Sequence, residues 1–327
     1  MRRSASIFSL AVLVAAALPA KEATVDTAVY ARIGNGYKRQ RLNDGTFKPE
    51  YYALSNGGRI SGTTTDLTVD RVKYPEVADI AMKLLAGQNF RYAQSRDQAK
   101  LLIVLQWGST IGFNRTNADQ IASAAGAAFA DLQNALRAAQ IDNLGSLRGA
   151  GDVAVGGGGQ DSQKLMEAQV ARDIFDSVMT RLHADNVARD QFNTHNARVL
   201  GFMDDLADSN DIRRWAGGGD RYTDLIGDVE ESRYYIVISA YDFPELTAKN
   251  NKKLLWQVRV SVRTPGNRFD DSVAAMLKSA SKYFGQDSGR LIRGEETKGT
   301  VEMGDLKFLG EAREPGALQT KPSEEKK

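Results

Sequence analysis

Residues 233–263, RYYIVISAYDFPELTAKNNKKLLWQVRVSVR, decide the fold. This stretch holds two strand-like runs, residues 233–243 and 253–264, which are joined by the polar connector 244–252. In the second run polar and apolar side chains alternate, so one face collects Leu254, Trp256, Val258, Val260 and Val262. Such alternation is typical of a strand with one buried face. The two runs therefore predict a strand pair at the centre of a sheet.

Two amphipathic helices and several further strands are expected around this pair. Residues 75–85 and 269–284 place apolar side chains at i, i+3 and i+4, as a helix with one buried face does. The almost wholly apolar run 101–107 predicts a strand covered on both faces. The other strand candidates are residues 51–54, 60–69, 90–93 and 300–309, with Asn56-Gly57-Gly58 as a turn between the first two. This order predicts an α+β fold, an antiparallel or mixed sheet with the two helices on one face.

A long insertion, residues 114–232, divides the expected core into residues 49–113 and 233–310. Residues 118–140 and 161–206 predict two helices, which the glycine-rich connector 141–160 joins. The second helix carries an apolar row, Met166, Val170, Ile174, Val178 and Leu182. Together they predict a helical hairpin that either packs on the sheet or projects from it. The insertion closes with residues 204–231, which carry nine acids. The first four of these acids predict a solvated acidic loop: Asp204, Asp205, Asp208 and Asp211.

The first twenty residues have the order of a signal peptide. Arg2 and Arg3 precede the apolar run 7–18, which is too short to span a membrane. Small residues allow cleavage after Ala17 or after Ala20. The alternative is a buried N-terminal helix. The pattern favours export, with the mature protein periplasmic or secreted and without a transmembrane span.

Two other terminal segments are expected to lie outside the core. Residues 21–48 are polar and contain several glycines, so they predict a flexible lead-in with one short strand. Residues 311–327 mix both charges with prolines and have almost no large apolar side chains, so they predict a disordered tail.

The composition excludes several kinds of chemistry. The chain has 327 residues and no cysteine, which rules out disulfides, thiol catalysis, zinc–thiolate sites and a lipid anchor on cysteine. Its signal-like segment holds two arginines and no acid, so the remainder has as many basic as acidic residues. This balance argues against nucleic acid as a partner. Disulfides would be more usual in a secreted eukaryotic domain, so a bacterial periplasmic or secreted setting is favoured.

Two pieces of the sequence carry a family resemblance. One is the first amphipathic helix followed by Gln88-Asn89-Phe90 and the strand-like run 99–105; the other is Leu255-Trp256 followed by helix 269–284. On these features the chain resembles a family of bacterial cell-envelope proteins of unknown function, which are often lipoproteins. The resemblance implies a sheet-and-two-helix core and provides no site residues. The chain departs from the family by its missing cysteine and by the insertion.

The sequence provides no catalytic, cofactor or metal motif. The loop 151–156 has the glycine spacing of a phosphate loop but lacks the lysine and hydroxyl that would follow, so it predicts a linker. His183 and His195 are not spaced as zinc ligands, and they are expected on a helix surface. Calcium binding stays open for the acidic segment, although its first acids lack EF-hand spacing: Asp204, Asp205, Asp208 and Asp211.

Three side chains are candidates for partner contact. Trp215 lies beside a run of glycines, and Arg259 and Arg263 lie on the open face of the second strand, where they are either solvated or paired with the acidic segment. The favoured function is a non-enzymatic binding or accessory component of the envelope, with the hairpin contacting an envelope protein or glycan and with no cofactor. Two other hypotheses are a carboxylate- or metal-dependent hydrolase of an envelope polymer and self-association through the hairpin.

Overall fold

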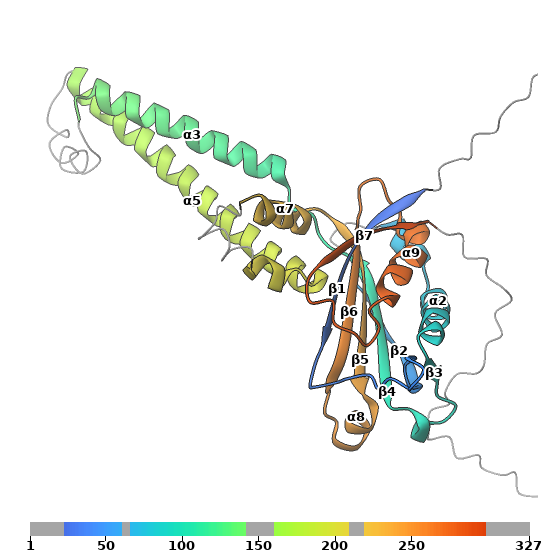
Figure 1. Ribbon diagram of the computed structural model, residues 1–327. Coiled ribbons are helices and arrows are strands. Elements are labelled where there is room, and N and C mark those ends of the chain that lie inside the picture. The colour runs from blue at the N-terminus through green and yellow to red at the C-terminus, as the bar shows by residue number, and fades with distance from the viewer. Residues whose placement is uncertain (1–22, 61–65, 142–159, 209–218, 299–327) are drawn as a thin grey trace, which may run out of the picture.

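The structure, a computed structural model, describes residues 23–60, 66–141, 160–208 and 219–298 (Figure 1). Within them the chain forms a mixed seven-stranded sheet, and helices α2 (Tyr74–Gly87) and α9 (Phe269–Ser281) cover one of its faces. The predicted α+β class, with two helices on one face and a long helical insertion, is therefore confirmed.

The strand order is β3-β2-β4-β5-β6-β1-β7. The strands are β1 (Thr24–Ile33), β2 (Glu50–Ile60), β3 (Phe90–Tyr92), β4 (Leu101–Ser109), β5 (Arg233–Asp242), β6 (Leu254–Arg263) and β7 (Ile292–Thr297). The other helices are α1 (Leu67–Arg71), α3 (Arg115–Ala138), α5 (Gln160–Leu200), α7 (Gly219–Glu230) and α8 (Phe243–Lys249), with a 3₁₀ turn at Arg96–Gln98. Strand β2 runs parallel to β3 and β4, whereas the other pairs are antiparallel.

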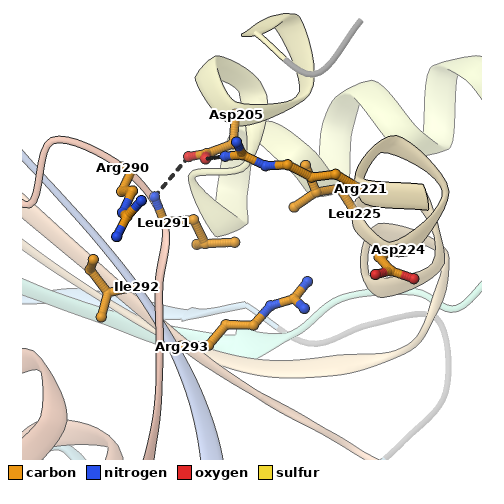
Figure 2. Close-up of a pocket in the computed structure, with 8 residues that line it drawn as sticks. All are labelled: Asp205, Arg221, Asp224, Leu225, Arg290, Leu291, Ile292 and Arg293. Atoms are coloured by element: carbon orange, nitrogen blue, oxygen red, sulfur yellow. Dashed lines mark hydrogen bonds and ion pairs between the residues drawn. The ribbon is translucent and has the colours of Figure 1, made fainter. Parts of the chain in front are cut away.

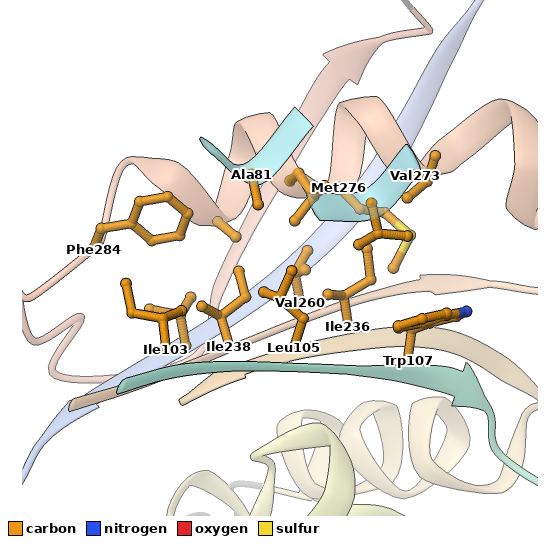
Figure 3. Close-up of a cluster of buried hydrophobic side chains, with 14 of the residues drawn as sticks. Ala81, Ile103, Leu105, Trp107, Ile236, Ile238, Val260, Val273, Met276 and Phe284 are labelled. Carbon is orange, nitrogen blue, oxygen red and sulfur yellow. The ribbon is translucent and has the colours of Figure 1, made fainter. Parts of the chain in front are cut away.

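The predicted strand pair lies inside the sheet, as β5 and β6. The two strands are antiparallel, with Ile236 opposite Val260 and Ile238 opposite Val258. Every one of the first eight residues of β5 is buried, because elements cover both faces of the sheet here. Apolar side chains of β4, β5 and β6 meet Ala81 of α2 and Met276 of α9 in the main core (Figure 3).

Trp256 is fully buried in this core, as the alternation of β6 predicts. Its ring packs against the rings of Phe90 and Phe284, each with centroids 5.8 Å away. Trp107 of β4 is buried as well and stacks on Tyr74 of α2. Both tryptophans are therefore core residues.

The expected flexible lead-in, residues 21–48, is wrong as a description of its first half. Residues Thr24–Ile33 form β1, a ten-residue strand that pairs with both β6 and β7. Five consecutive residues from Thr27 to Ala31 are buried, since this strand is also covered on both faces. In a strand that is buried on both faces, polar and apolar residues do not alternate. The sequence of this segment therefore predicted no more than one short strand.

The expected turn at Asn56-Gly57-Gly58 is also wrong, because β2 continues through it with an irregularity between Asn56 and Arg59. A Cβ at Gly57 would lie 2.4 Å from Cγ of Gln106, so glycine permits the close approach of β4. The second expected strand, residues 60–69, is wrong for its described second half: residue 60 ends β2, whereas residues 67–69 belong to α1. Asp66 caps α1 by accepting a hydrogen bond from Thr68 N at 2.8 Å.

The remaining predictions concern the connector 244–252 and segments that lie largely outside the described residues. The polar connector 244–252 contains the short helix α8, which Asp242 caps by accepting a hydrogen bond from Glu245 N at 3.0 Å. The last described strand is β7, whereas the expected strand 300–309 lies outside the described residues. The expected signal peptide, most of the glycine-rich connector and the expected disordered tail 311–327 also lie outside them.

The hairpin is made by α3 and α5, which run side by side away from the sheet (Figure 1). The buried residues of α3 follow a helical spacing: Ile121, Ala125, Ala128 and Leu132. On α5, Ala168 is buried and the ring of Phe175 lies against Phe129 of α3, with centroids 5.8 Å apart. The first three members of the apolar row of α5 are exposed: Met166, Val170 and Ile174.

The base of the hairpin covers the second face of the sheet. A smaller core forms there between the strands and the helices α5 and α7. Its buried members are Ala28, Ala197, Leu200, Phe202, Leu225, Val229, Tyr235 and Val237. The base of the insertion therefore packs on the sheet, and the rest of the hairpin projects from it. Each of the two predicted alternatives is correct for one end of the insertion.

Candidate functional site at the base of the hairpin

A sharp turn at Gly201 brings the end of α5 onto β1. Gly201 has a φ of +83°, a conformation that favours glycine, and its amide donates to Ala197 O at 2.9 Å. A Cβ there would lie 2.8 Å from Cδ1 of Tyr30, so a larger residue would strike the ring. The short helix of residues 203–208 starts directly after this turn and carries Asp204 and Asp205 toward the sheet.

Asp228 of α7 is a buried carboxylate that binds three arginines. Arg233 Nη1 lies 3.0 Å from Oδ1, Arg263 Nη2 lies 2.9 Å from Oδ1, and Arg293 Nη2 lies 2.5 Å from Oδ2. Burial lowers the pKa of Arg233, and the charge of Asp228 acts against that decrease. The network joins α7 to three strands of the sheet.

Glu230 makes a similar junction between α7 and the two hairpin helices. Its side chain is fully buried, it accepts hydrogen bonds from Arg189 and Asn193 of α5, and Arg115 of α3 lies 3.2 Å from it. Burial acts to raise the pKa of Glu230, but the hydrogen bonds from Arg189 and Asn193 outweigh it, so the pKa is lowered. Both hairpin helices are thus tied to α7 by one ionised carboxylate.

Asp205 stands in the wall of a cavity of about 470 Å³ between α7 and β7 (Figure 2). Its carboxylate accepts a hydrogen bond from Arg221 Nη2 at 2.6 Å and another from Leu291 N at 2.8 Å. Three acids of the segment 204–231 are therefore buried and bound by arginines, namely Asp205, Asp228 and Glu230. The expected solvated acidic loop is therefore wrong for Asp205, which is buried and paired with Arg221, whereas Asp204 and Asp208 are exposed.

A second cavity, of about 510 Å³, lies on the other side of the short helix 203–208. Cross-strand neighbours form its floor: Tyr30 of β1 lies opposite Arg259 of β6, and Arg32 lies opposite Gln257. Tyr30 donates a hydrogen bond to Asp204, and burial together with this bond raises the pKa of Tyr30 to about 12.

Arg259 is the most buried of the three arginines that line this cavity. It is half-buried, and burial lowers the pKa of its guanidinium, while the nearby Tyr30 and Asp204 act in the opposite direction. Within the part of the chain that the structure describes, it has no hydrogen bond and no ion pair. Asp204 is instead held by Tyr30 and by Arg32, whose Nη1 lies 3.6 Å from it.

The structure bears differently on the three residues that were proposed for partner contact. Arg259 lines the cavity beside Asp204, so it remains a candidate. Arg263 binds Asp228 and Glu231, so pairing with the acidic segment is the alternative that the structure supports. Trp215 lies outside the described residues. Tyr30 and Arg32 were not among the expected site residues, because they belong to the strand that was expected to be a lead-in.

The described residues hold no group of three or more histidines and acids placed to bind a metal ion. His183 and His195 are exposed on α5, as expected for helix-surface histidines. Asp211 lies outside the description, so calcium binding by the acidic segment stays a hypothesis. In the same described ranges, no helix combines the length and apolarity that a bilayer crossing requires.

Comparison of the chain with protein-family models and with curated proteins finds no match. The resemblance to the envelope family therefore stays a prediction.

Proposed function

We propose that this protein is a non-enzymatic binding or accessory component of the bacterial cell envelope, and that it contacts its partner through the α3–α5 hairpin. The observation that carries the proposal is the exposure of the first three members of the apolar row, hereafter called the row. They are Met166, Val170 and Ile174, and their exposed fractions are 66%, 52% and 53%. Clustered apolar side chains on a projecting element are characteristic of interaction surfaces. The envelope setting rests on the signal-like N-terminal segment and the family resemblance.

The hairpin geometry supports a contact role for this row. The face of α5 that meets α3 already contains Ala168 and Phe175, so the row is not needed to hold the two helices together. Full burial of such a side chain contributes roughly 1.5–3 kcal/mol, so burying the exposed parts of these three would supply a part of the binding free energy. The buried carboxylates at the base then hold the projecting helices in a fixed direction.

The hydrolase hypothesis lacks a comparable observation. It needs two buried acids of raised pKa in one groove. Glu50 has a pKa raised by burial, although hydrogen bonding from Tyr37 opposes the shift. In Glu230 and Glu296, burial is outweighed by hydrogen bonds from basic side chains, so the pKa of each is lowered.

The test replaces the row by Met166→Gln, Val170→Gln and Ile174→Gln, since glutamine keeps helix propensity. The matched control replaces three exposed polar residues at the same spacing on α5: Asp173→Gln, Ser177→Gln and Arg181→Gln. Full-length wild type and both variants are used to capture proteins from a periplasmic fraction, and light scattering with size exclusion reports their oligomeric state.

We expect a partner that the wild type and the control capture equally and that the row variant loses by at least about tenfold. If the lost partner is a second copy of this chain, the row is confirmed as a contact surface, and the interaction that it makes is self-association. Equal capture by all three proteins, or no row-dependent partner and a monomer throughout, would contradict the hairpin as contact surface.

A further inference from the structure

The cavity lined by Arg259 is a separate feature from the apolar row of the hairpin. Its walls come from β1 and the turn after it, from β6, and from the turn that follows α5. Its volume of about 510 Å³ lies within the range of small-molecule sites, which run from roughly 300 to 1,000 Å³. The site therefore has room for a small organic molecule.

Positive charge predominates in the lining. Arg32, Arg198 and Arg259 face one acid, Asp204, which is already bound by Tyr30 and Arg32. Arg259 presents a planar guanidinium with five N–H donors, a geometry that matches carboxylate and phosphate groups. Because the described residues leave this half-buried group without a hydrogen bond or ion pair, an external oxyanion would satisfy it.

The rest of the lining is held in place and is partly apolar. Asn35 Nδ2 donates to Leu254 O at 2.7 Å, and Gln257 Nε2 donates to Ser239 Oγ at 2.6 Å. Ile33, Met203 and Leu254 add apolar surface beside the arginines. A cavity with fixed polar groups and an apolar wall suits a ligand that has both a charged end and a hydrocarbon part.

We propose that this cavity binds a small organic anion, whose carboxylate or phosphate group pairs with Arg259 while Arg198 adds charge at the entrance. The ligand would bridge β6 and the end of α5, that is, the sheet and the base of the hairpin. The proposal does not depend on the hairpin's partner, because the residues involved lie apart from the apolar row.

The test is calorimetric titration of the full chain with inorganic phosphate and with succinate, at an ionic strength held constant with potassium chloride. We expect saturable one-to-one binding of at least one probe, and the better probe distinguishes a phosphate from a carboxylate site. Arg259→Gln should weaken that binding by at least about tenfold, because a charge-assisted hydrogen bond is lost. Arg290→Gln, an exposed arginine of the neighbouring cavity, is the control.

Arg198→Gln provides a second variant at an exposed position of the same cavity, should Arg259→Gln fail to fold. It should also weaken binding, since it removes one of the three positive charges. The proposal is overturned if neither probe saturates. It is also overturned if both cavity variants bind like the wild type, or if Arg290→Gln weakens binding as much as they do.

Discussion

Asp228 shows how a single carboxylate can fix the position of a helix on a sheet. It binds Arg233, which is almost fully buried, and also the more exposed Arg263 and Arg293. A buried charge without a partner would cost several kcal/mol, so Arg233 is compatible with the fold only while α7 holds Asp228 against it. This dependence gives α7 one preferred placement over β5, β6 and β7.

Glu230 gives a pH-dependent prediction at the same scale. Its folded-state pKa is lowered, so the stability it contributes is present above its unfolded pKa of about 4.3 and is lost as pH falls through the folded value. Glu230→Gln should reduce the free energy of unfolding by about 1–3 kcal/mol at pH 7. Urea unfolding should show this difference shrinking as pH falls from about 5 to about 3.

A difference that stays constant over that range would contradict the ionised state of Glu230 as the source of its contribution. Circular dichroism at pH 7 provides the control, because the variant must keep the wild-type helix content for the comparison to hold.

Part of this charge network could be predicted from the sequence. The alternation in β6 places Arg263 on the face opposite Trp256, and the segment 204–231 is visibly acidic. Which acid would meet Arg263 could not be predicted, since that depends on where α7 docks. Tyr30 and Arg32 were missed for a different reason, because five consecutive buried residues leave no alternation to recognise in β1.

Two glycines in the hairpin elements have opposite structural roles. Gly201 ends α5 with a positive φ and lies against the ring of Tyr30. Gly126 lies exposed within α3, and a Cβ added there would meet nothing within 4 Å. The first glycine is required by the geometry, whereas the second weakens a helix without evident compensation.

We therefore expect substitutions by alanine to have opposite signs. Gly201→Ala should lower the free energy of unfolding by about 1–2 kcal/mol or more, because it combines an unfavourable left-handed conformation with a clash against Tyr30. Gly126→Ala should raise it by up to about 1 kcal/mol through better helix propensity. Thermal or urea unfolding followed by circular dichroism measures both, and a stabilising Gly201→Ala would refute the close packing at this turn.

Elements with a regular apolar period were well predicted from the sequence. The two sheet helices α2 and α9 and the strand β6 each keep a period that matches their structure. The apolar row of α5 was recognised by its helical spacing, but the exposure of Met166, Val170 and Ile174 was not predicted. Spacing alone identifies an apolar row, but it does not identify what covers the row.

At the level of the whole molecule, the hairpin and the sheet should differ in local stability. Strand β5 is paired on both sides and covered on both faces, whereas α3 makes its main contacts with α5. Regions with few buried contacts open at a lower free energy than the core. Backbone amides of α3 should thus exchange with deuterium faster than those of β5.

Phe175→Ala should increase this difference, because it removes the ring that packs on Phe129. Hydrogen exchange followed by mass spectrometry should show exchange in α3 accelerated by at least about fivefold, with β5 and β6 unchanged. Val187→Ala, an exposed apolar residue on α5, is the control and should have little effect. Equal acceleration in α3 and β5 would show that hairpin and sheet open as one unit.

The position of β1 has a consequence for how the protein is made. This strand precedes all the others in the sequence, yet it lies between β6 and β7, which come last among the described strands. During synthesis or passage across a membrane, β1 appears long before either neighbour and has no partner with which to form its ladder. The seven-stranded sheet can be completed only after β7 has emerged, so we expect β1 to remain without its full ladder until late in synthesis and to be accessible to chaperones until then.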